Sequence, residues 1–258
     1  MNSATALEMQ HVTKKFGGVR ASNDIDLTVP TGQLRGVIGP NGAGKSTLFN
    51  LISGQLRPTS GKVLLNGADV TALPAYRRAR LGVSIVFQGA RLFSGMNVLE
   101  NVMVGCHAST SAGIVAGIFG TPSQRREERE IRDRAAHALE RVGLGAWGDR
   151  SVSGLPLGQQ RRIQMARALA GDPRLLLLDE PASGMRQEER REFVELVREV
   201  NAAGTTILLI EHDVPMVMSL ADRITVLDLG TVIAEGTPEE IRIDPRVIEA
   251  YLGKEEAA

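Results

Sequence analysis

The sequence has little cysteine and few aromatic residues, and its charges balance. Among its 258 residues is a single cysteine, Cys106. One thiol excludes an internal disulfide framework and a zinc cluster built on cysteines, and it favours a small buried hydrophobe. Aromatic residues make up 3%, and 30 Lys and Arg residues offset 30 Asp and Glu residues. No bulk basic field therefore points to nucleic acid.

Long apolar segments are also missing. Residues 1–10 lack the basic start and the apolar core of a secretory signal. The longest weakly polar stretch, residues 112–120, is far too short to cross a bilayer. We therefore expect a soluble, cytoplasmic protein, for which docking onto a membrane protein stays open. With 43% hydrophobic and 23% charged residues, the chain suits one large globular domain or a domain with a subdomain.

A glycine-rich segment organises the rest of the chain. It has the spacing Gly, four residues, Gly-Lys-Ser, and it stands between an apolar predicted strand at residues 34–38 and a predicted helix at residues 47–52. Its glycines let the backbone curl so that several N–H groups can face a phosphate. The lysine adds positive charge at the β- and γ-phosphates, and the serine hydroxyl suits Mg²⁺, which prefers oxygen ligands. The predicted phosphate-binding residues are Gly39, Pro40, Asn41, Gly42, Ala43, Gly44, Lys45 and Ser46.

Polar residues follow three further predicted strands. One apolar strand ends at Gln88, four consecutive leucines end at Asp179 and Glu180, and another buried strand ends shortly before His212. Parallel α/β sheets place ligand contacts at these carboxyl ends. Adjacent strand residues face opposite sides, so one acid can face a metal and the other an attacking water. The alternatives are that the glutamine and the acids only end their strands, and that the histidine is an ordinary loop residue.

Two other regions bear on function. Phe16 stands before two glycines, between predicted strands at residues 7–12 and 25–29. On a glycine turn it could stack on a purine base, although a loop phenylalanine more often covers core. Residues 91–152 have helical patterns, including a charged helix at residues 123–142 with an apolar stripe, which predicts a helical subdomain inserted in an α/β core.

Taken together, these motifs resemble the nucleotide-binding subunit of an ABC transporter, over essentially the whole chain. The order that carries the resemblance is Phe16, the glycine-rich segment, Gln88, a Gly-Gln-Gln turn before a helix, residues 175–180 and His212. Some stretches more specifically resemble the ATP-binding proteins of high-affinity branched-chain amino acid importers, and most of all the larger of that system's two ATPase subunits. These stretches are residues 14–18, 91–93, 97–102, 158–162 and 244–253.

The resemblance implies one ABC ATPase domain of the α/β class. Its P-loop NTPase core, which is RecA-like, would have an N-terminal antiparallel β part and an inserted α-helical subdomain. We expect the core at about residues 1–90 and 165–240, and the helical subdomain with the signature turn at about residues 91–164. A C-terminal helix and tail would occupy residues 241–258.

The resemblance also assigns ATP and Mg²⁺ as cofactors. Phe16 would stack on adenine, the glycine-rich segment would hold the phosphates, and Thr47 would lie near the α-phosphate. Glu180 would polarise the attacking water and His212 would contact the γ-phosphate, which makes the protein an ATPase whose catalysis is mostly positioning and charge neutralisation. The residues implied around Mg²⁺, partly through water, are Ser46, Gln88 and Asp179.

Such subunits work as head-to-tail pairs, in which each ATP lies between one P-loop and the other subunit's signature turn. The usual signature is Leu-Ser-Gly-Gly-Gln, and Pro156 here offers neither a hydroxyl nor an N–H. Gly158 and the helix start after the turn could still donate N–H groups. Arg186 stands where Asp or Asn is usual, so we expect the ATP site completed by this chain's signature to be the weaker one. The signature residues are Leu155, Pro156, Leu157, Gly158 and Gln159.

The implied partners are a second ABC ATPase subunit, identical or homologous, and integral-membrane permease subunits that face the segment beginning at Arg91. A substrate-binding protein would act indirectly, and no nucleic acid is expected. The implied location is peripheral, at the cytoplasmic face of the inner or plasma membrane.

Three alternatives stay open at this point. The same role could serve urea, short amides or other amino acids. A non-transport ABC ATPase acting on DNA or ribosomes usually has a second ATPase domain, coiled-coil insertions, zinc cysteines or a basic surface, none of which this sequence shows. A nucleotide-gated subunit with little hydrolysis is suggested by Pro156 and Arg186 and opposed by Glu180.

Overall fold

The computed structural model describes residues 4–89, 91–109 and 122–252. Contacts divide the chain into two compact units. The first holds the described residues up to Phe87, Arg174–Pro181 and those from Val194 onward, and the second holds Gln88–Pro173 and Ala182–Phe193. The contacts thus group residues 165–173 with the helical unit, while the subdomain boundaries expected from the sequence remain a proposal. The connection expected near residues 112–120 and the tail from residue 253 lie outside the described ranges.

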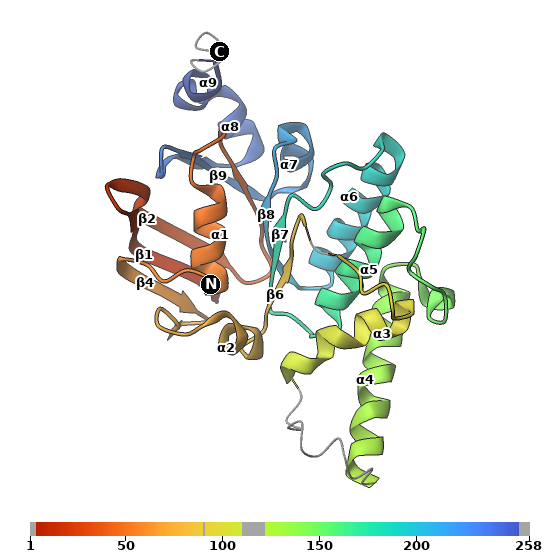
Figure 1. Ribbon diagram of the computed structural model, residues 1–258. Helices are drawn as coiled ribbons and strands as arrows, with labels where there is room; N and C mark the ends of the chain where they lie inside the picture. Colours follow the sequence, from red (N-terminus) through yellow and green to blue (C-terminus); the bar gives the residue numbers. More distant parts are fainter. Residues whose placement is uncertain (1–3, 90, 110–121, 253–258) are drawn as a thin grey trace. The chain divides into compact units, whose positions relative to one another are not determined.

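The first unit contains an antiparallel sheet and a larger, mainly parallel sheet (Figure 1). The antiparallel sheet consists of β1 (Thr5–Phe16), β2 (Val19–Pro30), β4 (Ser60–Leu65) and β5 (Ala68–Asp69), in the order β2-β1-β4-β5. β1 is longer than expected and runs through Phe16, which pairs with Val19 across the glycine turn. This sheet is the N-terminal antiparallel part that the sequence predicted.

The larger sheet has the order β10-β9-β3-β8-β7-β6, and only its edge strand β10 runs antiparallel to its neighbour. Its strands are β3 (Leu34–Ile38), β6 (Val83–Val86), β7 (Leu175–Asp179), β8 (Thr206–Ile210), β9 (Arg223–Asp228) and β10 (Thr231–Gly236). All residues of β3 and β8 are buried, as continuous apolar runs in a parallel sheet require. The α/β, P-loop NTPase class is confirmed by this topology together with the solved structures reported below.

Helices complete both units. The first unit contains α1 (Lys45–Ser53), α2 (Ala75–Arg80), α7 (Val214–Leu220), α8 (Pro238–Ile243) and α9 (Pro245–Leu252). The second contains α3 (Val98–Met103), η1 (Val104–Ser109), α4 (Pro122–Arg141), η3 (Gly145–Trp147) and α5 (Leu157–Leu169). α6 (Gln187–Ala202) begins in the second unit and ends in the first.

Two helix boundaries differ from expectation. α5 begins at Leu157, directly after Pro156, so most of the signature turn is already helical rather than preceding a helix at residue 161. The fixed φ of proline suits the position before a first helical turn. The C-terminal helix is two helices, because Asp244 is extended before Pro245.

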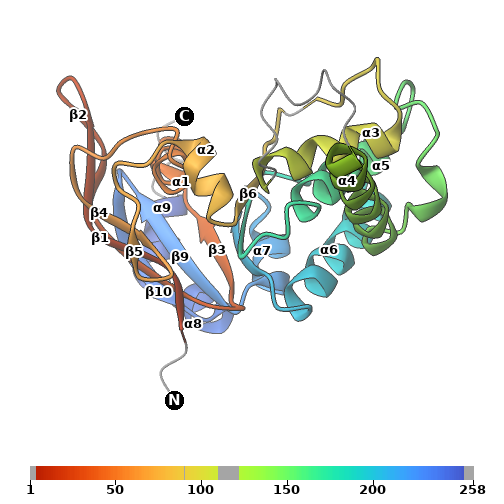
Figure 2. The same ribbon diagram turned by 90° about the horizontal axis from the view of Figure 1, so that it is seen from below.

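The core of the first unit gathers around α1, which lies beside both sheets (Figure 2). Leu48 and Leu51 of α1 are buried in one cluster with Leu27 of β2 and Leu208 of β8. Because α1 begins at the end of the glycine-rich segment, this packing fixes the direction in which that segment leaves β3. In the second unit, Cys106 is buried as predicted, and burial raises the pKa of its thiol.

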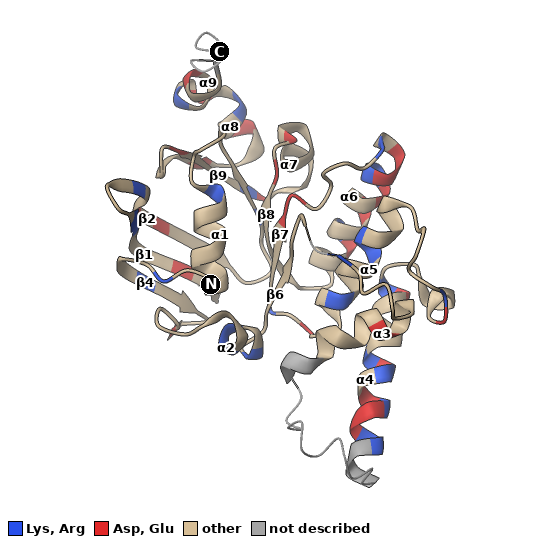
Figure 3. Cartoon of the chain, viewed as in Figure 1, with Lys and Arg blue, Asp and Glu red and all other residues tan. Residues whose placement is uncertain are grey.

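Within the described ranges, none of the helices combines the length and the apolar character needed to cross a bilayer. Acidic and basic residues are interspersed along α4 and α6 (Figure 3). This mixture agrees with the balanced net charge.

Arg78 ties α2 to the end of α1. Its buried guanidinium donates to the carbonyl oxygens of Leu51 at 2.7 Å and Ile52 at 2.8 Å, in the last turn of α1, and to Leu73 O at 3.0 Å. Burial lowers the pKa of Arg78 to about 10. These bonds satisfy carbonyl groups that a helix end leaves without partners.

Replacing Arg78 by Met tests this contact. We expect the free energy of unfolding to fall by about 2–4 kcal/mol, because buried carbonyl groups lose their donors. Urea denaturation of the full chain measures the change, with the exposed Arg80→Met as the matched control. Equal midpoints for the two variants would contradict the structural role.

Candidate functional site

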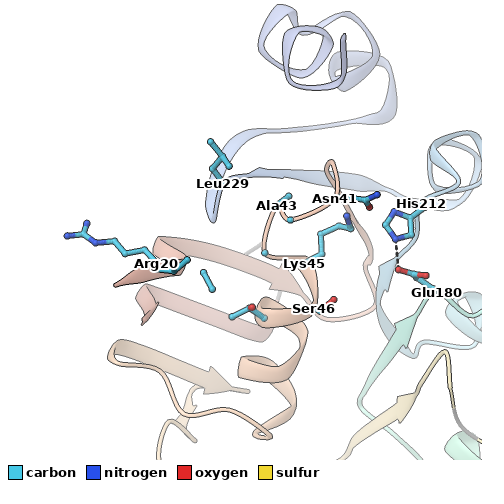
Figure 4. Close-up of a pocket in the computed structure, with 13 residues that line it drawn as sticks. Arg20, Asn41, Ala43, Lys45, Ser46, Glu180, His212 and Leu229 are labelled. Carbon is cyan, nitrogen blue, oxygen red and sulfur yellow. Dashed lines mark ion pairs between the residues drawn. The ribbon is translucent and has the colours of Figure 1, made fainter. Parts of the chain in front are cut away.

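A cleft of about 540 Å³ opens over the glycine-rich segment in the first unit (Figure 4). The predicted phosphate-binding residues from Asn41 to Ser46 line it together with Thr47, Glu180 and His212. The sequence thus brings the P-loop and two of its predicted catalytic residues to one cavity. The remaining lining residues are Val19, Arg20, Ala21 and Leu229.

Two glycines of the loop are required by close backbone approach. A Cβ on Gly39, which has φ 152°, would stand 2.1 Å from the carbonyl oxygen of Leu227. A Cβ on Gly44, which has φ 100°, would stand 2.5 Å from the carbonyl oxygen of Ala21. No side chain fits at these distances, so the loop can adopt this path only with glycine.

The loop presents positive charge at the start of α1. Gly44 is the N-cap of α1 and carries no capping side chain. The first N–H groups of the helix, whose residues line the cleft, therefore have no side-chain cap. Lys45 is buried, and its Nζ donates to Gly39 O at 2.7 Å and Pro40 O at 3.1 Å. A helix N-terminus beside a fixed ammonium group is chemically suited to phosphate.

Glu180 and His212 lie beside each other at one side of the cleft (Figure 4). His212 Nε2 lies 2.5 Å from Glu180 Oε1, and the two side chains are 49% and 16% exposed (Figure 4). Glu180 has φ 46°, a left-handed backbone that non-glycine residues rarely adopt. Its N–H donates to Ile210 O at 2.8 Å, which holds this conformation at the end of β7. The pair can hold a proton or orient a polar group over the loop.

Asp179 is the last residue of β7 and, like Glu180, is partly buried. Burial raises the pKa of its carboxyl group, and the charge of Glu180 raises it further, while His212 acts in the opposite direction. A cation at this carboxylate would relieve both costs. The donor set of a carboxylate and the exposed hydroxyl of Ser46 is the oxygen chemistry that Mg²⁺ prefers, so the residues of this unit fit the ion.

Other predicted site residues lie elsewhere. Phe16 is 48% exposed at the end of β1 and does not line the cleft; the ammonium of Lys14 lies 5.1 Å from its ring centroid. Gln88 belongs to the second unit, where its Nε2 donates to Ser183 Oγ at 3.3 Å. The signature residues also belong to the second unit, at the start of α5. The roles assigned to all of these residues stay predictions.

The sequence did not indicate that the turn between β9 and β10 helps to build the cleft. Gly230 N donates to Ala43 O at 3.0 Å, Asn23 N donates to Gly230 O at 2.7 Å, and Leu229 reaches the cleft wall. The contact of Gly230 with the glycine-rich segment follows from β9 lying next to β3, which no local sequence pattern reveals.

Comparisons with known proteins agree with this geometry. A family model described as "ABC transporter" matches residues 22–183, and one described as "Branched-chain amino acid ATP-binding cassette transporter" matches residues 231–257. The chain is 45% identical over 253 residues to the high-affinity branched-chain amino acid transport ATP-binding protein LivG of Escherichia coli, covering 98% of this chain and 99% of LivG.

Solved structures show the same fold. One is the ADP conformation of an ATP-binding cassette of an ABC transporter, with a TM-score of 0.84 and 30% identity over 96% of this chain and 99% of that one. Another is a dimeric post-hydrolysis state of an ATP-binding cassette bound to ADP and Pi, with a TM-score of 0.74 and 26% identity over 90% of this chain and 98% of that one.

Asp179→Asn tests the electrostatic cost at the site. Because the folded-state pKa of Asp179 is raised above its ordinary value, the folded state binds this proton more tightly than the unfolded state. The ionised carboxylate therefore costs stability above its folded-state pKa, and this cost disappears as the pH falls toward 3.8, the ordinary value. We expect the variant without nucleotide to melt at a higher temperature than the unmodified protein at pH 8.

The gain in melting temperature should shrink at pH 5, because the folded-state carboxyl with its raised pKa is closer to taking up a proton there and the cost of its charge is smaller. Thermal unfolding of the full chain at both pH values, without divalent ions, measures it. A variant that melts at a lower temperature at pH 8 would show that the carboxylate is stabilised by contacts rather than penalised by burial.

Proposed function

The chain belongs to the ATP-binding subunits of ABC transporters and is an ATPase coupled to transport, and on that premise we propose that it energises the import of branched-chain amino acids. Two matches support this substrate. LivG carries it in its name, and the C-terminal family match at residues 231–257 carries it in its description. Urea, short amides or other amino acids are the alternative cargoes.

The observation that carries the catalytic proposal is the position of Glu180 beside His212 in the cleft over Lys45. The loop and the start of α1 hold the phosphates. Lys45 gives up its hydrogen bonds to the carbonyl groups of Gly39 and Pro40 and contacts the phosphates instead. Glu180 accepts a proton from the attacking water, and His212 orients the terminal phosphate. Phosphoryl transfer of this kind needs positioning and charge neutralisation more than covalent help.

Mg²⁺ would be held by the hydroxyl of Ser46 and the carboxylate of Asp179, with Gln88 as a further predicted contact. The ion, when bound, neutralises charge on the β- and γ-phosphates. Asp179 itself brings a partly buried carboxylate, and its raised pKa means that nearby positive charge would stabilise the ionised form. Phe16 is the proposed adenine contact, because its ring is exposed at the end of β1 in the same unit as the cleft.

The proposed assembly is a dimer of ATPase subunits on a membrane permease, at the cytoplasmic face of the membrane. The dimeric solved cassette supports the pairing of such domains. The second subunit is either identical or homologous, and a substrate-binding protein delivers the cargo to the permease. A nucleotide-gated subunit with little hydrolysis is the competing proposal, since Pro156 and Arg186 depart from the usual motifs.

Reconstitution with the partner subunit, permease and binding protein in liposomes tests both parts of the proposal. We expect ATP-dependent uptake of radiolabelled leucine, and Glu180→Gln should lower ATP hydrolysis by about 100-fold or more because it removes the general base. The exposed Glu199→Gln is the matched control and should leave both rates unchanged.

The outcomes separate the alternatives. Uptake of urea or an amide instead of leucine would contradict the substrate and keep the transport ATPase. ATP hydrolysis unchanged by Glu180→Gln would contradict the assigned base and favour the nucleotide-gated subunit.

A further inference from the structure

A carboxylate of the second unit joins two loops. Glu189 lies in the first turn of α6, where its Oε2 accepts a hydrogen bond from the N–H of Arg186 at 3.0 Å. Its Oε1 accepts a hydrogen bond from the N–H of Gly158 at 3.0 Å. The bond from Arg186, followed by the bond from Gly158, lowers the pKa of Glu189, so the group is an anion at neutral pH.

The bond to Gly158 engages a donor at the start of α5. The first N–H groups of a helix have no partner inside it, and together they carry partial positive charge. Pro156 is the N-cap of α5 and makes no side-chain capping bond. Glu189 therefore supplies, from 31 positions away, the negative charge that the start of this 13-residue helix attracts.

Local packing favours this approach. A Cβ on Gly158 would stand 2.8 Å from Glu189 Oε1, so the absence of a side chain lets the carboxylate reach the backbone. Arg162, one turn further along α5, pairs with Glu192 of α6 at 3.0 Å and holds the same two helices together. Both contacts link α5 to the part of α6 that lies in the second unit.

We propose that Glu189 is an internal competitor for the start of α5 and weakens the ATP site that this chain's signature turn completes. The proposal rests on the proposed function, in which this chain pairs with a second ATPase subunit. In such a pair, the terminal phosphate of the ATP bound at the second subunit's P-loop approaches residues 155–159 of this chain. That phosphate would meet a negative charge and a Gly158 N–H that is already engaged. Pro156 cannot compensate, because it has neither a hydroxyl nor an N–H.

The departures from the usual motifs at Pro156 and at Arg186 then act on the same property, which is the number of N–H donors that the start of α5 can offer. Pro156 reduces the donors that α5 can offer, and the segment at Arg186 places Glu189 where it occupies one of those that remain. Glu189 is in this account a positioning residue, because it acts through the backbone of α5 rather than on the reacting atoms. A purely structural cap would affect stability without changing the ATP concentration that the assembly requires.

The test compares the KM for ATP of the reconstituted transport complex with Glu189→Gln and with unmodified subunits. Glutamine keeps the size and one acceptor oxygen and removes the charge. We expect KM to fall by about tenfold, since one charge near a helix start and a phosphate is removed. The neighbouring, exposed Glu188→Gln removes the same charge without the bond to Gly158 and should leave KM unchanged.

Glu189→Asp, which keeps the charge on a shorter side chain, separates charge from packing. A KM close to that of the unmodified complex is expected for this variant. A KM that is unchanged or raised in Glu189→Gln, or lowered equally in Glu189→Asp or Glu188→Gln, would overturn the proposal. Absence of ATP hydrolysis in the unmodified complex would instead count against the proposed function.

Discussion

The structure depends on the close approach of two neighbouring backbones to the loop at residues 39–46. The carbonyl oxygens of Leu227 and Ala21 lie where Gly39 and Gly44 leave no room for a Cβ. This contact fixes the loop between β9 and the start of β2, and the loop in turn fixes the start of α1. The uncapped start of the helix, the buried ammonium of Lys45 and the cleft wall all follow from that one steric constraint.

The two adjacent acids at the end of β7 differ in backbone conformation and in surroundings. Asp179 ends the regular strand and is penalised by burial, so it favours a cation. Glu180 turns into the left-handed region and reaches His212 in the cleft. The two side chains therefore leave the strand end in different directions, which fits the two roles proposed for them, and both positions depend on β7 and β8 being paired in register.

Sequence patterns predicted the parts of the fold that short-range rules control. The apolar runs at β3, β7 and β8 and the spacing of the glycine-rich segment are of this kind. The start of α5 at Leu157 differs from the predicted Gly-Gln-Gln turn, because Pro156 already favours a helix start.

Contacts between distant segments could not be predicted in this way. The approach of Leu229 to the cleft depends on strand order, and the bond from Gly158 to Glu189 depends on how α5 packs on α6. Neither leaves a periodic signal in the sequence. Motifs therefore predicted most of the residues that line the cleft. The negative charge that Glu189 places at the signature turn is visible only in the structure.

The central claim is that the cleft over the glycine-rich loop binds the phosphates of ATP through Lys45 and the start of α1. Equilibrium titration of the full chain with Mg-ATP, for the unmodified protein and for Lys45→Met, tests it most directly. We predict saturable binding that weakens by about tenfold or more in the variant, because a charge-assisted contact is lost, while the exposed control Lys62→Met binds normally. Equal affinities for the unmodified protein and Lys45→Met would contradict the account.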